Sequence, residues 1–288
     1  MDIKNTADLC VLAYNNEDII TKTLQNISDN ILPYIDCRVL VLDNGSIDNT
    51  YDKIRQFAFV EALRVENNRY FSGGANYLLA HCRSDHVFFM SSDVNPKSDT
   101  LPKIIEYANG NENAGLISCL SIMPNGEIEK TVKKFYSPLQ LHTAYGVLRY
   151  FANSMKDKLF DYYYIKEGFP LKSPLVVDVL QDSFLYIRGE LIGKIKGYDE
   201  TLKLYFTEDD ICKRAKELGY SAVYLTDTSV YHIAESTTSQ DRKKSQKIYI
   251  SDCLQYCQKY FGNHHMLFLK YDILFANYLK KIIRKIVL

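Results

Sequence analysis

The chain has 288 residues, of which 47% are hydrophobic and 24% are charged, and 35 basic side chains balance 35 acidic ones. A chain of this length buries a sizeable core, so we expect one α/β domain with an extension, or two small domains. The composition excludes an intrinsically disordered protein. A net charge of zero disfavours binding to nucleic acid through overall basicity, so we expect no nucleic-acid partner.

The seven cysteines are scattered, odd in number and never spaced Cys-x-x-Cys, which fits neither a disulfide scaffold nor a zinc site. They are Cys10, Cys37, Cys82, Cys119, Cys212, Cys253 and Cys257. A reducing cytoplasm is therefore the expected location. The first residues contain no apolar signal region, and the chain contains no uncharged run of about 18 apolar residues, so we expect neither secretion nor a membrane span.

In the first half, short apolar runs alternate with helical patterns, which is typical of βαβ units and a largely parallel sheet. We expect strands over residues 9–13, 38–42, 64–66 and 87–90, and helices over residues 17–28, 48–59 and 75–82. Polar residues follow these strands at their carboxyl ends. In an open α/β sheet, ligands bind at that edge.

The second half is less regular. Asn125-Gly126 predicts a hairpin turn. We expect one or two strands over residues 176–187, a helix over 208–218, and short strands over 221–225 and 229–232. The chain ends in two long predicted helices, over residues 241–261 and 266–286, with Gly262-Asn263 as the break between them.

Three polar clusters accompany the first three expected strands. Ala13-Tyr14-Asn15-Asn16-Glu17 follows the first strand, where Asn or Glu could simply cap a helix. Asp43-Asn44-Gly45-Ser46 follows the second, where Asn-Gly could simply form a turn. Ser72-Gly73-Gly74-Ala75-Asn76 opens the expected third helix. Paired glycines there would let the backbone approach a phosphate or a sugar closely.

A fourth cluster, Ser91-Ser92-Asp93-Val94-Asn95, comes directly after the apolar strand at residues 87–90. A carboxylate at the end of a buried strand is costly unless it is paired or binds a metal. Oxygen ligands of this kind suit Mg²⁺ or Mn²⁺ held jointly with substrate phosphates. The alternative is that Asp93 only caps the next turn.

Further on, Thr207-Glu208-Asp209-Asp210 places three acids in the first turn of an expected helix. Thr207 and Asp210 could form a capping box, and acids stabilise a helix N-terminus. Crowding three carboxylates also raises the proton affinity of at least one of them, which a general base requires. His232 ends the last expected strand and could be an ordinary buried histidine.

The order of these clusters resembles the family 2 glycosyltransferases, inverting enzymes with a GT-A fold that build bacterial polysaccharides. The rhamnosyltransferase-like members are the most similar in style. The resemblance covers roughly residues 8–232 and implies a Rossmann-like, mostly parallel sheet flanked by helices. It implies a catalytic domain over residues 1–240, with a nucleotide-binding half (1–96) and an acceptor half (97–240), followed by a helical extension over residues 241–288.

The resemblance also implies roles for individual residues. Nucleotide contacts fall on Ala13, Tyr14, Asn15 and Glu17, recognition of a pyrimidine base on Asp43, and lining of the nucleotide-sugar on Gly73, Gly74, Asn76 and Ser92. The family's metal motif falls on residues 91–93, where only its last acid is present. The implied ligands of Mg²⁺ or Mn²⁺ are Asp93, and Asn95 if the motif is read forward as Asp93-Val94-Asn95. His232 resembles a histidine of the family that contacts the metal or the diphosphate.

The acid motif of the family falls on residues 207–214. Anchoring it on Cys212 puts Glu208 at the catalytic base and Asp210 at the second acid, while a shifted register makes Asp209 the base. The implied reaction is metal-assisted single displacement of a sugar from a UDP- or dTDP-sugar onto a hydroxyl of a glycan or lipid-linked glycan.

Two other classes share this layout. A sugar nucleotidyltransferase typically opens with a glycine-rich phosphate loop, and residues 13–17 contain no glycine. A non-catalytic carbohydrate-binding protein could keep the fold, but the three crowded acids speak against it. Residues 130–172, rich in Tyr, Phe and Lys, are expected to shape the acceptor site.

The last segment, residues 266–288, carries five basic side chains and one acid, Asp272. Apolar residues, among them Phe268, Tyr271 and Phe275, recur there at helical spacing. A basic amphipathic helix with aromatic residues suits an anionic membrane surface, so we expect peripheral association with the cytoplasmic face of the membrane. The alternative is a helix that packs on the catalytic domain or on a second subunit of a homodimer.

Overall fold

The computed structural model describes residues 7–151, 160–233 and 242–287. Its strands are β1 (Ala7–Ala13), β2 (Cys37–Asp43), β3 (Val60–Arg64), β4 (His86–Ser91), β5 (Val94–Pro96), β6 (Ala114–Ile122), β7 (Val132–Lys133), β8 (Leu175–Val177), β9 (Val179–Leu180), β10 (Phe184–Arg188) and β11 (Ser221–His232). The central sheet has the order β3-β2-β1-β4-β10-β6-β11-β5, with β8 also paired to β11, and β7 and β9 pair separately. Most pairs between long strands are parallel, while β10 runs antiparallel to both neighbours.

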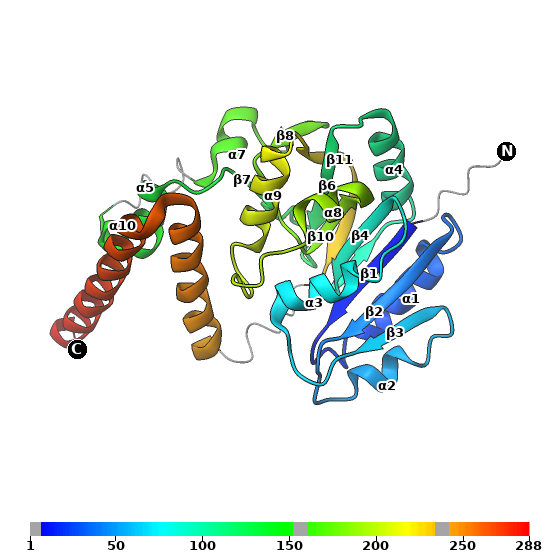
Figure 1. Ribbon diagram of the computed structural model, residues 1–288, viewed down its shortest axis with the longest axis horizontal. Helices are drawn as coiled ribbons and strands as arrows, with labels where there is room; N and C mark the ends of the chain where they lie inside the picture. The colour runs from blue at the N-terminus through cyan, green and yellow to red at the C-terminus, as the bar shows by residue number, and fades with distance from the viewer. Residues whose placement is uncertain (1–6, 152–159, 234–241, 288) are drawn as a thin grey trace.

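The helices are α1 (Ile20–Asn30), α2 (Thr50–Ile54), α3 (Tyr70–Leu79), α4 (Thr100–Gly110), α5 (Pro138–Tyr145), the 3₁₀ turn η1 (Val147–Tyr150), α7 (Tyr162–Glu167), α8 (Gly189–Ile195), α9 (Thr207–Glu217) and α10 (Arg242–Val287). Successive strand residues point to opposite faces of a sheet. Leu9 and Val11 of β1 therefore pack with α1 and α4, while Cys10 packs with α3, α8 and α9. The expected α/β sheet flanked by helices is confirmed (Figure 1).

The polar segments that follow β1, β2 and β4 meet at one edge of the sheet. Strand β1 is parallel to both neighbours, with Ala13 opposite Asp43 and Leu12 opposite Ser91. The three strands therefore end at nearly the same level. This common edge is the one that the sequence predicts for ligand binding.

Several predicted boundaries in the first half were wrong. The strand expected at residues 64–66 is β3 at Val60–Arg64, and the helix expected over 48–59 shortens to Thr50–Ile54. The helix expected from residue 75 begins at Tyr70, so Gly73 and Gly74 lie within α3. A Cβ built on Gly74 would lie 2.7 Å from Leu12 Cδ1, so the glycine lets α3 pack tightly on β1. Packing overrides the low helix propensity of glycine here.

In the second half, the predicted hairpin at Asn125-Gly126 is confirmed, with Gly126 at φ 82° and its N–H donating to the Met123 carbonyl. The two short strands expected over 221–225 and 229–232 form the single strand β11, which is irregular between Leu225 and Ser229. The segment expected to hold one or two strands holds β8, β9 and β10.

Helix α10 is broken at Gly262, which has φ 87° and ψ 171°, so the predicted break is confirmed. Figure 1 shows α10 as a bent pair of helices at the end of the molecule away from β3. Both halves pack with α5 in a third core that contains Leu141, Phe206, Tyr256 and Leu269. In the described part of the chain, no helix is long and apolar enough to cross a membrane.

Candidate functional site

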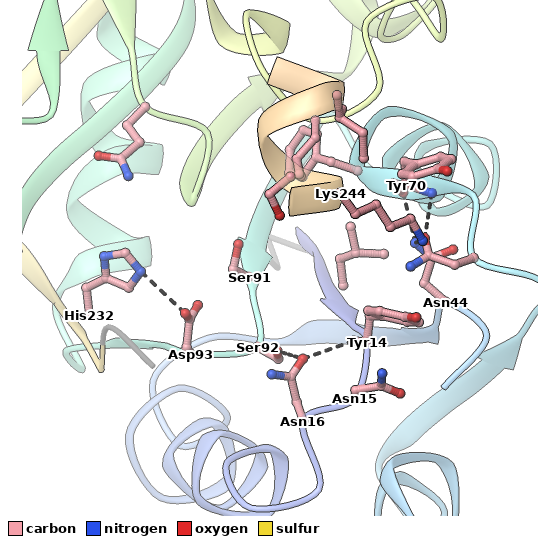
Figure 2. Close-up of a pocket in the computed structure, with 17 residues that line it drawn as sticks. Tyr14, Asn15, Asn16, Asn44, Tyr70, Ser91, Ser92, Asp93, His232 and Lys244 are labelled. Carbon is pink, nitrogen blue, oxygen red and sulfur yellow. Dashed lines mark hydrogen bonds and ion pairs between the residues drawn. The ribbon is translucent and has the colours of Figure 1, made fainter. Parts of the chain in front are cut away.

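A cavity of about 530 Å³ opens at the carboxyl ends of β1, β2 and β4. Its wall is rich in amide and hydroxyl side chains, contributed by Asn15, Asn16, Asn44, Asn68, Ser91 and Ser92. Figure 2 shows Asp93 and His232 at one end of the cavity, and Tyr70 and Lys244 at the other. The arrangement suits a polar, elongated ligand that carries negative charge.

The segments after β1 and β4 are joined by one amide. Asn16 Oδ1 accepts hydrogen bonds from the Tyr14 N–H at 3.0 Å and from Ser92 Oγ at 2.8 Å. Helix α1 begins at Ile20 and has no side-chain cap, so Asn16 and Glu17 do not serve as its N-cap. The amide instead fixes the floor of the cavity between two strands.

Asn44 holds the wall of the cavity beside α3, and two residues that line the cavity have strained backbone conformations. Asn44 Nδ2 donates to the Tyr70 carbonyl at 2.8 Å, and its Oδ1 accepts from the Arg69 N–H at 3.1 Å. Tyr70 has φ 59° and Asn15 has φ 52°, both in the left-handed region that costs energy for residues other than glycine. Strain of this kind clusters at functional sites, and both residues line the cavity.

At the other end, His232 lies between two carboxylates. His232 Nε2 is 3.5 Å from Asp93 Oδ2, and Nδ1 is 3.0 Å from Glu129 Oε2. Hydrogen bonding to Asp93 and then to Glu129 raises the pKa of His232 to about 10. Asp93 Oδ1 is buried and has no hydrogen-bond partner among the described residues, which is costly for a carboxylate oxygen.

The unpartnered Asp93 oxygen fits a divalent cation, whereas His232 Nε2 would have to lose its proton before it could coordinate one. Among the residues that the structure describes, no group of three or more His, Cys, Asp and Glu side chains is placed to hold a metal ion. A cation here would therefore need further ligands from substrate phosphate and water. Asn95 lies in β5 opposite Tyr231 and does not line the cavity. Its Oδ1 is also buried and finds no partner in the described ranges 7–151, 160–233 and 242–287.

In the acid motif, Asp210 is fully engaged in structural contacts. Its side chain is 1% exposed, and Arg214 Nε donates to Oδ2 at 2.7 Å. Lys259 Nζ and Tyr260 Oη of α10 donate to Oδ1 at 2.6 and 2.7 Å. Asp210 therefore joins α9 to α10.

Glu208 and Asp209 share one lysine. Lys133 Nζ lies 3.0 Å from Glu208 Oε1 and 2.8 Å from Asp209 Oδ2. The side chain of Asp209 is fully buried, whereas that of Glu208 is 21% exposed. Burial raises the pKa of Asp209 to about 7; Lys133 opposes this rise, and the charge of Glu208 adds to it.

Asp182 connects the acid motif to the cavity. Thr207 Oγ1 donates to Asp182 Oδ2 at 2.9 Å, and the neighbouring Gln181 lines the cavity. Burial, followed by the charge of Glu208, raises the pKa of Asp182 well above its ordinary value. The residue before α9 is Phe206, with φ 62°, and no side chain caps the helix, so the alternative of a capping box at Thr207 is wrong.

Several residues predicted to bind the donor do not line the cavity. Ala13 and Asp43 are buried at the ends of their strands, and Asp43 accepts the Ser46 N–H and pairs with Arg64 at 3.2 Å. Glu17 accepts from Asn49. Gly73 and Gly74 are buried inside α3, while Asn76 binds the backbone of Tyr198. The predicted residues that do line it are Tyr14, Asn15, Ser92, Asp93 and His232.

Sequence reasoning missed other residues of the site. Asn16 and Asn44 stand in clusters that the sequence singled out, so their position after a strand was the available signal. Lys133 and Lys244 carry no local signal, because each reaches the site from a distant part of the chain.

Comparison with known proteins gives a consistent picture. The model of the family described as glycosyl transferase family 2 matches residues 8–166. The uncharacterized glycosyltransferase YfnE of Bacillus subtilis is 26% identical over 216 residues, which are 72% of this chain and 53% of that protein. The chain therefore spans about half the length of that relative. An N-acetylglucosaminyl-diphospho-decaprenol L-rhamnosyltransferase of Mycobacterium tuberculosis is 22% identical over 235 residues, 74% of each protein.

Solved structures share the fold. The mannosyltransferase PcManGT of Pyrobaculum calidifontis, in complex with GDP-Man and Mn²⁺, has a TM-score of 0.59 at 15% identity, covering 94% of this chain and 72% of that one. TarS 1–349 of S. aureus, in complex with UDP-GlcNAc, has a TM-score of 0.57 at 14% identity, covering 88% and 66%. These likenesses concern the fold alone, and they confirm the expected GT-A architecture.

Proposed function

The chain belongs to glycosyl transferase family 2, and on this premise we propose that it moves a sugar from a UDP- or dTDP-sugar to a hydroxyl of a glycan or lipid-linked glycan. The proposed setting is the synthesis of a bacterial surface polysaccharide. The observation that carries this proposal is the cavity whose amide-rich wall ends at Asp93 and His232. The rhamnosyltransferase named above supports a lipid-linked acceptor, and the neighbours bound to GDP-Man and UDP-GlcNAc support a nucleotide-sugar donor.

In this proposal the nucleotide lies along the wall formed by Tyr14, Asn15 and Asn44. Amide side chains offer both donors and acceptors, which suits the edge of a base and the hydroxyls of a ribose. Asp43 acts indirectly. It accepts a hydrogen bond from the Ser46 N–H and thereby fixes the turn that contains Asn44. This arrangement explains how a buried Asp43 could still influence which base is bound.

Asp93 would hold Mg²⁺ or Mn²⁺ jointly with the donor diphosphate. His232 would contact the diphosphate while its ring is protonated, or the cation once Nε2 has lost its proton. The cation, when bound, would neutralise the charge that develops on the leaving nucleoside diphosphate. Mn²⁺ in the solved PcManGT complex supports this cofactor. Ser92 acts by holding Asn16, which keeps the backbone next to Asp93 in place.

Glu208 is the proposed general base. Asp210 has its oxygens occupied by Arg214, Lys259 and Tyr260, and Asp209 is fully buried, so Glu208 is the acid of the motif that remains accessible. Lys133 Nζ lies 3.0 Å from Glu208 Oε1 and holds the carboxylate in place. Glu208 takes the proton of the acceptor hydroxyl while that oxygen bonds to the anomeric carbon. The bond from carbon to phosphate oxygen breaks on the opposite face, which inverts the centre.

The experiment combines donor binding with product analysis. Thermal shift with a panel of nucleotide-sugars plus Mn²⁺ identifies the donor, and transfer is then measured with Glu208→Gln and Asp93→Ala. We expect Glu208→Gln to bind donor but to lose transfer by at least about a hundredfold, within the range for a general base. Asp93→Ala should lose both donor binding and transfer. The control is Glu127→Gln on the exposed hairpin, which should keep both. Full activity of Glu208→Gln would contradict the assignment, and release of pyrophosphate would indicate a nucleotidyltransferase instead.

A further inference from the structure

The second half of α10 is apolar on two sides, and only one side is buried. Leu269, Ile273 and Ala276 are buried against the rest of the protein. On the opposite side lie six large residues with exposures of 43–66%, which we call the outer face: Leu267, Phe268, Tyr271, Leu274, Phe275 and Tyr278. Soluble monomers rarely leave such a contiguous apolar surface exposed unless it binds something.

Contacts to α5 and η1 fix the rotation of this helix. Asp272 accepts from His142 Nδ1 at 2.5 Å and from the Val147 N–H at 2.9 Å. Tyr150 Oη donates to the Ala276 carbonyl at 3.0 Å. The helix therefore cannot turn its outer face inward without breaking these bonds.

The charges around the outer face are all of one sign. At 3.6 residues per turn, Lys270 and Lys281 lie along one edge of it, and both are exposed. The sole acid in residues 264–282 is Asp272, which is 14% exposed and bound to His142. The sequence of residues 138–150, which covers α5 and η1, contains no acid.

We propose that the outer face docks on the surface of an anionic phospholipid bilayer, with the helix lying in the plane of the membrane. The aromatic and leucine side chains would enter the boundary between headgroups and acyl chains, and the lysines would lie near lipid phosphates. Tyrosine suits this depth, because one end of its ring is apolar and the other hydrogen-bonds. The proposal stands independently of the reaction catalysed.

The charge pattern favours a bilayer over a second copy of the chain. In a twofold dimer the same patch meets itself. The lysines would find no counter-charge on the second copy, because the sole acid of residues 264–282, Asp272, is bound to His142. Anionic lipid supplies the missing counter-charge.

The test is co-sedimentation of the full chain with vesicles of phosphatidylcholine alone or of equal parts phosphatidylcholine and phosphatidylglycerol. We expect binding to the anionic vesicles that weakens with added salt. Tyr271→Ser with Phe275→Ser should lower the partition coefficient about tenfold or more. Lys270→Gln with Lys281→Gln should lower it at least about tenfold.

The matched control is Tyr34→Ser with Val176→Ser, which removes two apolar side chains that are each 62% exposed but lie elsewhere. It should bind vesicles like the wild type, and circular dichroism should show that all variants remain folded. The proposal is overturned if the wild type ignores anionic vesicles, if it binds phosphatidylcholine equally well, or if the Tyr271 and Phe275 variant binds unchanged. The outer face would instead bind a second copy of the chain if light scattering showed wild-type dimers that the Tyr271 and Phe275 variant loses, and if the wild type did not bind vesicles.

Discussion

Replacing Asp210 with asparagine removes the negative charge that joins α9 to α10. The carboxylate is 1% exposed and binds Arg214 at 2.7 Å, Lys259 at 2.6 Å and Tyr260 at 2.7 Å. Removing one partner of a buried ion pair costs about 3–5 kcal/mol. Since the Arg214 and Lys259 side chains keep 19% and 33% of their exposure, water relieves part of this cost. We therefore expect a loss of about 3 kcal/mol in the free energy of unfolding.

Urea denaturation followed by circular dichroism measures this loss, and the melting temperature should fall by about 6–10 °C. The matched control is Asp178→Asn, which breaks a pair with Lys216 of the same helix. Lys216 is 64% exposed, so this change should cost less than about 1 kcal/mol.

Comparison with Glu208→Gln separates structure from chemistry. That variant should unfold at the wild-type urea midpoint and yet fail in transfer, because Glu208 is partly exposed and makes one ion pair. If Asp210→Asn instead kept the wild-type midpoint while transfer was lost, Asp210 would be a catalytic group. The structural assignment of this acid would then be refuted.

Three further outcomes are expected. Gly74→Ala places a Cβ 2.9 Å from Asn44 Nδ2, so it should lower the free energy of unfolding, measured with urea, by about 1–3 kcal/mol. It should also weaken donor binding in thermal shift. Gly193→Ala in α8 has open space around the new methyl group, so it should change neither quantity. Because burial raises the pKa of Asp209 from 3.8 to about 7, the folded protein holds a proton there that the unfolded chain releases, so stability should fall as pH rises across this window. In Asp209→Asn, stability should fall less over the same pH range. If the urea midpoint fell equally with pH in the variant and the wild type, the raised pKa of Asp209 would be contradicted. EDTA should abolish transfer, and added Mn²⁺ should restore it. Asp93→Asn should raise the Mn²⁺ concentration needed for donor binding at least about tenfold. If that concentration stayed the same in the variant, Asp93 would not be a metal ligand.

The first strands could be predicted from the sequence because their signals are local. The apolar runs at residues 9–13, 38–42 and 87–90 all lie within observed strands. Parallel strands joined by helices must end at one edge, so the clustering of Tyr14, Asn15 and Asp93 followed from topology. The break at Gly262 was equally local, since glycine readily adopts a positive φ.

Helix boundaries were less predictable, because packing decided them. Helix α3 runs through Gly73 and Gly74, which local propensity placed at its start. The space beneath Gly74 is filled by Leu12 and Asn44, so the pair serves close approach between helix and sheet. On α10, the predicted stripe with Phe268, Tyr271 and Phe275 is exposed, whereas Leu269 and Ile273 on the other side pack in the core with α5.

By itself, the sequence determined which residue types stand at the edge of the sheet and which family they resemble, because strand periodicity and motif order are written along the chain. Only the tertiary structure distinguished the three acids of the motif. Asp209 is buried, Asp210 is occupied by α10, and Glu208 meets a lysine 75 positions away. Burial and ion pairing depend on partners distant in the chain, so the availability of each carboxylate is a property of the fold.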